Sequence, residues 1–338
     1  YAWGVMLLSL PLMVFASRFD LRRLLLAVIA LFACGQFLSA VAPTFPILVL
    51  ARLVVAAAHA IFWSIASVMA ARLVDAEHGA LALSMIATGS SIAQIFGLPL
   101  GRAIGLAVGW RMTFCVVGAV AAAILVYQAV VFPVMPAGER FTLGQLPSLM
   151  RNRVLLTLYV VTIFMSCSYY VGYSYIEPFL QQMAHLDAGT ITMALTVFGF
   201  AGLLGSVSFS RFFDGHRFGF LLGVIGGLAL SLLLMQAASF SLVSVLALCV
   251  LWGLCATAFN VAFQAEVISF TQASASAVAM SIFSGLFNLG IGCGAAIGGA
   301  VVSRGAIAGI GYVGAGIGVV GVICTVAWMF PAIKRARG

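Results

Sequence analysis

An arginine and a histidine stand seven residues apart inside the otherwise apolar stretch ARLVVAAAHAIFWSI (51–65). Because an α-helix has 3.6 residues per turn, Arg52, His59 and Trp63 share one helix face. Ser64 lies beside that face. Ionisable side chains are costly in hydrocarbon, so this face is expected to meet a wet cavity or a buried polar partner.

Two interpretations of His59 stay open. It either makes an interhelical hydrogen bond that only holds helices together, or it binds substrate or a proton, since His changes charge near physiological pH. Trp63 favours substrate, because sugar rings rest on indole and the indole N–H donates to hydroxyls. Arg52 is expected near the outer end of its helix, where it either snorkels outward or orients a carboxylate that couples transport to protons.

Tyrosines and a glutamate gather in SYYVGYSYIEPF (168–179). Tyr169 and Tyr173 are four residues apart and share a helix face, which leaves open whether they line a cavity or form an aromatic belt at the membrane interface. Glu177 is expected at the outer mouth, where Pro178 limits helix continuation, and it is a second proton candidate.

Three amides also lie inside apolar runs, namely Asn260, Gln264 and Asn288. Such amides join helices for about 0.6 kcal/mol on average, and they equally bind hydroxyl groups. Asn288 is expected at the depth of His59, so the polar side chains of both parts of the chain are predicted to meet in one central cavity. Glu266 is expected to be solvated at its helix end.

The composition is that of an integral membrane protein. Of 338 residues, 64% are hydrophobic and 7% are charged, whereas soluble domains carry about 25% charged residues. The net charge of +8 reflects short loops rather than nucleic-acid binding. All seven cysteines fall inside apolar runs without metal-ligand spacing. The absence of a phosphate-binding Gly-x-x-x-x-Gly-Lys loop and of a Ser/His/Asp constellation argues against an ATP-driven pump and against an enzyme, and no cofactor or metal is expected.

Apolar runs long enough to cross a bilayer recur along the whole chain, which predicts an all-α protein with eleven spans. They are expected at 1–16, 24–42, 47–71, 82–107, 112–135, 154–177, 190–209, 218–237, 242–266, 276–302 and 308–330.

Lys and Arg set the predicted orientation. With alternating sides, twelve cations fall on one side and two, Arg111 and Arg304, on the other, so the first side is cytoplasmic. The polar linker 136–153 and the tail are then cytoplasmic, and Tyr1 starts outside. We expect one further helix before Tyr1, which gives twelve spans in two six-helix halves, 1–135 and 154–338.

A repeat supports two pseudo-symmetric halves. SRFDLRR (17–23) and SRFFDGHR (210–217) lie about 193 residues apart, and the Gly-rich segments 89–105 and 285–301 lie at a similar offset. Paired halves with a site between them are a common transporter plan. The charged loops are predicted to form a cytoplasmic gate, with ordinary topology-setting charge as the alternative. The gate residues are Asp20, Arg22, Arg23, Asp214 and Arg217.

These stretches resemble a known family. SLPLMVFASRFDLRR is similar to the loop signature of the major facilitator superfamily, and LVLARLVVAAAHA (48–60) is similar to the fourth-helix signature of its proton-linked antiporters. YAWGVMLLSLPLM, AHAIFWSI, IATGSSIAQIFGLPLGR, GWRMTF, YSYIEPF and FSGLFNLGIG resemble the bacterial sugar efflux transporters, which export arabinose and related sugars or glycosides.

The resemblance implies a major facilitator fold in the bacterial inner membrane and alternating access driven by protons. In these relatives the helix that would precede Tyr1 carries an acidic residue, whose behaviour Arg52 would tune. The substrate-binding candidates are His59, Trp63, Ser64, Tyr169, Tyr173, Asn260, Gln264 and Asn288. The expected partners are a small sugar, protons and membrane lipids, with no nucleic acid, and a monomer is expected.

Other functions stay open. Many drug antiporters carry adjacent Gly-Pro residues in this fourth span, whereas this chain has Gly-Leu-Pro-Leu-Gly-Arg with Arg102, which favours sugars over drugs. The alternatives are a proton-linked exporter of drugs or nucleosides, a passive facilitator, and a sensor or channel that uses this fold without cycling.

Overall fold

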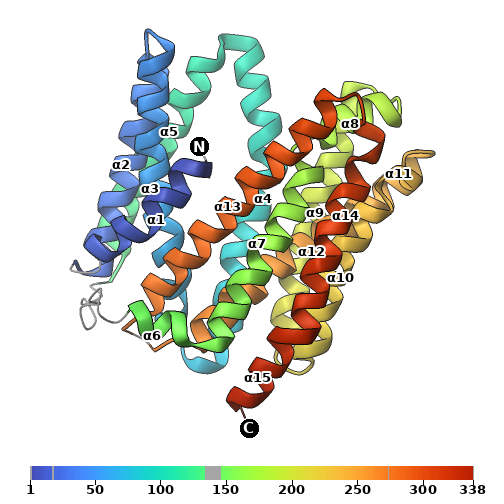
Figure 1. The fold of residues 1–338 in the computed structure, drawn as a ribbon. Coiled ribbons are helices and arrows are strands. Elements are labelled where there is room, and N and C mark those ends of the chain that lie inside the picture. Colours follow the sequence, from blue (N-terminus) through green and yellow to red (C-terminus); the bar gives the residue numbers. More distant parts are fainter. Residues whose placement is uncertain (1, 17–18, 134–145, 273, 338) are drawn as a thin grey trace.

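The computed structural model describes residues 2–16, 19–133, 146–272 and 274–337. Every regular element among them is helical. Figure 1 shows the helices in two groups with α13 leaning across between them. The N-terminal group contains α1 (Ala2–Ala16), α2 (Leu21–Val41), α3 (Phe45–Arg72), α4 (Gly79–Val108) and α5 (Trp110–Val131).

The C-terminal group begins with a short helix and ends with a basic one. It contains α6 (Leu146–Arg151), α7 (Arg153–Tyr173), α8 (Ile176–Met183), α9 (Ala188–Phe212), α10 (Arg217–Leu233), α11 (Met235–Ala238), α12 (Leu242–Ser269), α13 (Ser276–Ser303), α14 (Ile310–Cys324) and α15 (Phe330–Arg337). Single turns at Ala76–His78 and Ile307–Gly309 and a π-helical turn at Thr325–Met329 complete the described elements.

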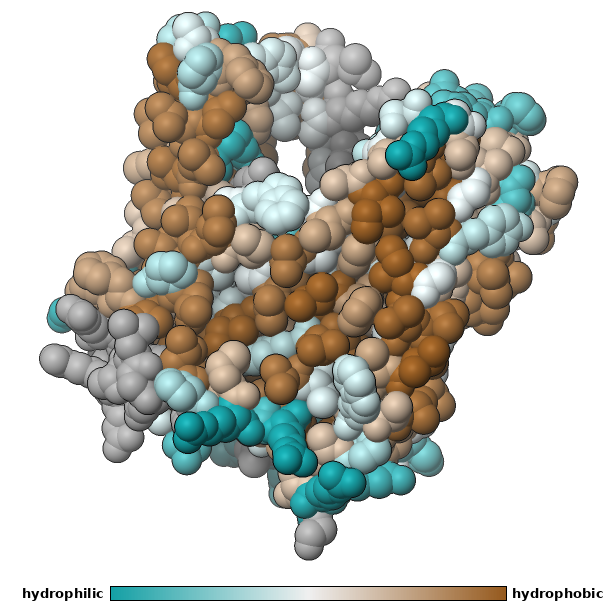
Figure 2. All heavy atoms as spheres, in the orientation of Figure 1, coloured by the Kyte–Doolittle hydropathy of each residue, from teal (hydrophilic) through white to brown (hydrophobic). Residues whose placement is uncertain are grey.

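Each of the eleven predicted spans coincides with a helical segment. Nine helices of the described chain are long and apolar enough to cross a membrane, and the shorter apolar helices α1 and α10 stand at two further predicted positions. The count of eleven spans therefore stays a prediction. Figure 2 shows a broad apolar belt on one face, with hydrophilic residues toward its two ends. A surface of this kind suits a hydrocarbon core between two polar interfaces.

The predicted span 154–177 is wrong at its outer end. Helix α7 stops at Tyr173, and the N–H groups of Ser174 and Tyr175 turn back to the carbonyls of Tyr170 and Gly172. Pro178 lies in the first turn of α8, where a missing N–H costs no helical hydrogen bond. In an uninterrupted helix its ring would clash with the Ser174 carbonyl, so the break agrees with the expectation that Pro178 limits helix continuation.

The predicted linker 136–153 is partly helical, because α6 occupies its end. Residues 136–145 of that linker, together with Ser17 and Arg18 of the first charged loop, lie outside the described residues.

Two seams join the groups, one where α1 packs on α13 and one where α4 packs on α9. Glycines allow the second seam to close. A Cβ added at Gly202 would stand 2.6 Å from Ser91 Oγ, and one added at Gly199 would stand 2.7 Å from Ile95 Cγ1. Small residues bring helix backbones together in membranes, where packing rather than water exclusion drives association. The space between the two seams holds the candidate site.

Candidate functional site

A cavity of about 430 Å³ lies between the two groups of helices. Its described lining comes from α3, α4, α7, α9, α12 and α13, with Ala2 of α1. This volume lies within the range of small-molecule sites, which is about 300–1,000 Å³.

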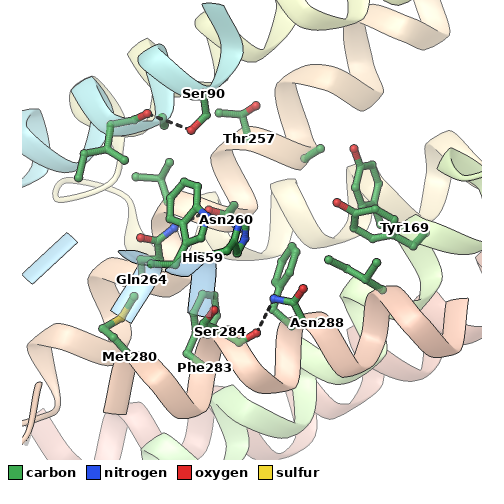
Figure 3. Close-up of a pocket in the computed structure, with 18 of the residues that line it drawn as sticks. His59, Ser90, Tyr169, Thr257, Asn260, Gln264, Met280, Phe283, Ser284 and Asn288 are labelled. Atoms are coloured by element: carbon green, nitrogen blue, oxygen red, sulfur yellow. Dashed lines mark hydrogen bonds between the residues drawn. The ribbon is translucent and has the colours of Figure 1, made fainter. Parts of the chain in front are cut away.

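Most of the predicted binding residues line this one cavity. Figure 3 shows His59 near its middle, next to Asn260. His59 and Asn288, which come from opposite groups of helices, line the same space rather than separate helix contacts. The predicted residues in the lining are His59, Trp63, Tyr169, Asn260, Gln264 and Asn288.

Ser64 and Tyr173 are not among the described lining residues. Ser64 is fully buried and donates a 2.7 Å hydrogen bond to the Ala60 carbonyl of its own helix. Tyr173 stacks on Tyr169 with ring centroids 5.0 Å apart. It therefore supports a lining residue instead of facing the cavity itself.

Sequence reasoning missed several lining residues, among them Ser90, Thr257, Ser284 and the aromatic Tyr170. The hydroxyl of a serine or threonine inside a helix can donate a hydrogen bond to the carbonyl three or four residues earlier. Its presence in an apolar run therefore does not indicate a cavity. Ser90 does this with the Ile86 carbonyl at 3.1 Å. A signal was available for the other two hydroxyls, because Thr257 and Ser284 precede the predicted amides Asn260 and Asn288 by three and four residues.

The described lining combines apolar and aromatic side chains with polar ones that are uncharged, apart from one imidazole. Its described residues offer three side-chain amides, three hydroxyls of Ser and Thr, two tyrosines and the indole of Trp63, and they include no carboxylate, Lys or Arg. The His59 and Trp63 rings lie 6.1 Å apart between centroids. Amides and hydroxyls beside aromatic faces can bind a compact ligand that has many hydroxyls and one apolar face.

A series of hydrogen bonds between side chains joins the two groups of helices at one end of the cavity. Ser67 of α3 donates a hydrogen bond to the amide oxygen of Gln264 on α12, and Gln264 Nε2 donates to Asn260 Oδ1 at 2.5 Å. A second contact joins the groups nearby, where Ser206 Oγ of α9 donates to the Ser84 carbonyl of α4 at 2.8 Å. These contacts lie within about two turns of the arginine-rich helix ends.

Arg52 and Glu177, the predicted proton-coupling residues, are absent from the described lining. Arg52 Nη1 donates to Gln36 Oε1 at 3.2 Å, and its guanidinium lies 5.3 Å from the Phe114 ring centroid. It therefore faces α2 and α5, although it shares a helix with His59. Glu177 is exposed on α8.

The predicted gate residues of the first loop make contacts within the N-terminal group. Asp20 caps α2 by accepting from the Arg23 backbone N–H at 2.7 Å, and it pairs with the Arg23 side chain at 2.9 Å. Arg22 Nη2 donates to the Ala129 carbonyl at the end of α5 at 2.5 Å.

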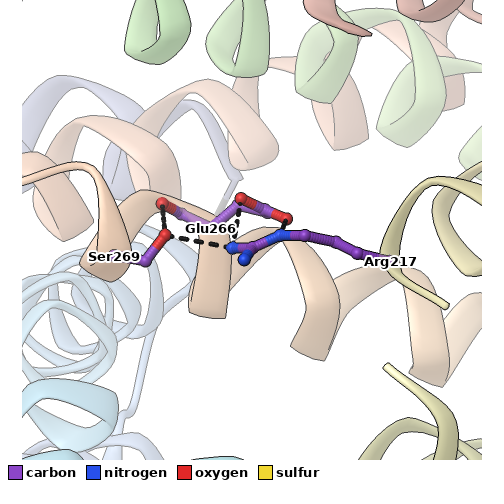
Figure 4. Close-up of polar contacts among 3 residues, drawn as sticks. All are labelled: Arg217, Glu266 and Ser269. Carbon is purple, nitrogen blue, oxygen red and sulfur yellow. Dashed lines mark hydrogen bonds and ion pairs between the residues drawn. The ribbon is translucent and has the colours of Figure 1, made fainter. Parts of the chain in front are cut away.

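In the second loop, the arginine has a partner that the sequence did not suggest. Arg217 forms a bidentate ion pair with Glu266, in which Nη2 to Oε2 measures 2.7 Å, and also reaches Ser269 Oγ at 3.2 Å (Figure 4). The expectation that Glu266 is solvated is wrong, because its side chain is fully buried. Asp214 is exposed. The contacts that the structure gives these loop residues stay within one group and do not cross the seam.

Comparisons with known proteins agree with this architecture. The family model described as Major Facilitator Superfamily matches residues 1–265 and 158–337. A curated protein of Mannheimia succiniciproducens named "Probable sugar efflux transporter" is 40% identical over 323 residues, which cover 96% of this chain and 81% of the relative.

Solved structures show the same fold. The human organic anion transporter MFSD10 superposes with a TM-score of 0.81 at 14% identity, over 96% of this chain and 81% of the other. The Escherichia coli fucose:proton symporter FucP superposes with a TM-score of 0.73 at 14% identity, over 96% and 88% of the two chains.

Proposed function

The chain belongs to the Major Facilitator Superfamily, and from that membership we propose that it exports a small neutral sugar or polyol through the cavity between its two groups of helices. The membership confirms the predicted fold class and a multi-pass transporter of the bacterial inner membrane. It is a transporter rather than an enzyme.

The set of uncharged amides and hydroxyls within a largely apolar and aromatic lining is the observation that carries the sugar proposal. Asn260, Gln264 and Asn288 present amides that both donate to and accept from sugar hydroxyls. Trp63 and Tyr169 present ring faces against which the C–H face of a pyranose or furanose packs. A cation or an organic anion would find no opposite full charge on the described lining apart from a protonated His59.

The relative supports the direction of transport. Its printed name refers to sugar efflux, and at 40% identity it covers nearly the whole of this chain. Arabinose and related sugars or glycosides are the substrates that we propose, in agreement with the motifs that resemble sugar exporters.

Proton antiport is a second part of the proposal. His59 lines the cavity, and an imidazole can take up and release a proton. A proton that enters as sugar leaves would give His59 a positive charge. This charge weakens sugar binding only if the sugar binds in direct contact with His59. Arg52 and Glu177 remain candidates that would act from outside the described lining.

Alternating access is the third part. The Lys/Arg excess places the arginine-rich helix ends in the cytoplasm, where Ser67–Gln264 and Ser206–Ser84 join the groups. We infer that this conformation is closed to the cytoplasm. Residues 1–135 and 154–338 would then rock about the cavity as two halves, and these contacts would break as the inner side opens.

Counterflow in proteoliposomes tests the function. Vesicles preloaded with unlabelled L-arabinose should accumulate labelled arabinose, and the Asn260→Ala variant should lose most of this exchange. Robust transport of a hydrophobic drug or nucleoside without exchange of any pentose or glycoside would overturn the sugar proposal. Net sugar flux that is unchanged by an imposed pH gradient would favour a passive facilitator over an antiporter.

A further inference from the structure

Cations from three elements surround the cytoplasmic end of α12. The guanidinium of Arg337 lies 5.3 Å from the ring centroid of Phe270, the residue that follows α12. The Phe270 carbonyl accepts a 3.1 Å hydrogen bond from Asn152. Arg151 and Arg153 flank Asn152 in the sequence, so they lie close to the same junction.

Helix α15 carries three exposed cations, Lys334, Arg335 and Arg337. Ile333 is fully buried and fixes the helix against the bundle, and Phe330 packs edge-to-face on Phe218 with centroids 5.1 Å apart. Lys334 Nζ lies 5.5 Å from the Phe218 ring, yet its side chain is exposed. The exposed cations of the basic cluster, as we call this set, are Arg151, Arg153, Lys334, Arg335 and Arg337.

The basic cluster has no neutralising carboxylate within the part of the chain that the structure describes. Two ion pairs occur there, Asp20 with Arg23 and Glu266 with Arg217. Glu266 accepts both of its bonds from Arg217 and is buried. The five cations are exposed, and none of them pairs with a carboxylate of the described residues.

The position of the basic cluster indicates which kind of anion it would bind. In Figure 2 hydrophilic residues gather along the lower edge of this face, where α6 and α15 lie in Figure 1, directly below the apolar belt. Trp328, two residues before α15, is 59% exposed, and tryptophan favours the headgroup level of a bilayer. An anion bound here would lie where lipid phosphates lie.

We propose that the basic cluster binds the headgroup of an anionic phospholipid, phosphatidylglycerol or cardiolipin, from the cytoplasmic leaflet. Arginine guanidinium groups bind phosphate oxygens with two parallel hydrogen bonds, and Lys334 adds a point charge. The acyl chains would continue along the apolar surface beside Trp328. The site adjoins the end of α12, the helix that carries Asn260 and Gln264. Bound lipid would therefore also restrain the position of these two cavity residues.

Native mass spectrometry of the purified full-length protein tests the proposal without any transport measurement, so its outcome is separate from that of the proposed function. Phosphatidylglycerol should remain bound in preference to phosphatidylcholine. The Lys334→Gln/Arg335→Gln/Arg337→Gln variant should bind phosphatidylglycerol about tenfold more weakly, since phosphate contacts are lost from exposed side chains that the fold does not need.

A pair of single substitutions distinguishes binding at the basic cluster from a general effect of the net charge. Arg337→Gln should weaken phosphatidylglycerol binding about threefold, whereas Arg304→Gln, an exposed cation at the opposite end of the molecule, should leave it unchanged. Equal weakening by both single variants, or unchanged binding by the triple variant, would overturn the proposal. Competition by millimolar inorganic phosphate or by a soluble acidic peptide as strong as that by the lipid would also overturn it, because the site would then be a free-anion or protein site.

Discussion

Ser67 on α3 donates a hydrogen bond to Gln264 on α12, which joins the two groups of helices directly beside the cavity. The same Gln264 side chain lines the cavity and donates to Asn260. A ligand hydroxyl that bonds to either amide therefore competes with, or reorients, this contact between the two groups. This relationship ties ligand occupancy to the conformation.

Ser67→Ala should favour the inward-open state. The change removes one interhelical hydrogen bond, worth about 0.6 kcal/mol in membranes, and so shifts the equilibrium about threefold. Labelling of a Met280→Cys reporter with a membrane-impermeant reagent from the cytoplasmic side, in a background without the natural cysteines, measures this shift. Ser64→Ala is the matched control, because Ser64 bonds only to its own helix. Equal labelling rates in wild type and Ser67→Ala would contradict the gating role.

Asn260→Ala and Asn288→Ala should each weaken sugar binding about threefold to tenfold, since a neutral hydrogen bond contributes about 0.5–1.5 kcal/mol net. Equilibrium binding of labelled sugar to the purified protein measures the change. Gln236→Ala serves as the control, because this amide lies on α11, outside the described cavity lining. If the control loses as much affinity as the two cavity variants, the effect is one of folding rather than of contact.

The sequence predicted the fold and much of the cavity for identifiable physical reasons. A long apolar run in a membrane must form a helix to satisfy its backbone hydrogen bonds. A polar residue near the middle of such a run, such as His59 or Asn288, is therefore expected to face a water-filled interior rather than lipid. Contacts between distant residues were not predictable in this way. Glu266 pairs with Arg217 across 49 positions, and Ser67 looks like any helical serine until α12 is placed opposite it. The sequence also did not predict that α7 ends as early as Tyr173.

Glu266→Gln should reduce the free energy of unfolding by about 3 kcal/mol, the lower end of the range for breaking a buried ion pair. The carboxylate is fully buried, and its loss leaves Arg217, which is 15% exposed, without its counter-charge. Denaturation in detergent, followed by tryptophan fluorescence, measures the change. Glu177→Gln removes an exposed carboxylate on α8 and should leave stability unchanged. A destabilisation below about 0.5 kcal/mol would show that the Arg217–Glu266 pair does not hold α10 and α12 together.

His59→Gln should flatten the pH dependence of sugar efflux between about pH 5 and 8, because imidazole is the side chain whose ordinary titration falls in this window. In the proposed antiport, the neutral form of His59 favours sugar binding from the cytoplasm and the protonated form favours sugar release, so efflux depends on pH as long as His59 carries the proton. Glutamine keeps one donor and one acceptor near the ring nitrogens but cannot take up the charge. Uptake of sugar into inverted vesicles, whose outer face is the cytoplasmic one, measures the profile at fixed sugar gradients. His216→Gln, an exposed histidine at the start of α10, is the control. A profile that keeps its inflection in His59→Gln would assign the proton to another group and leave His59 a hydrogen-bonding residue of the cavity.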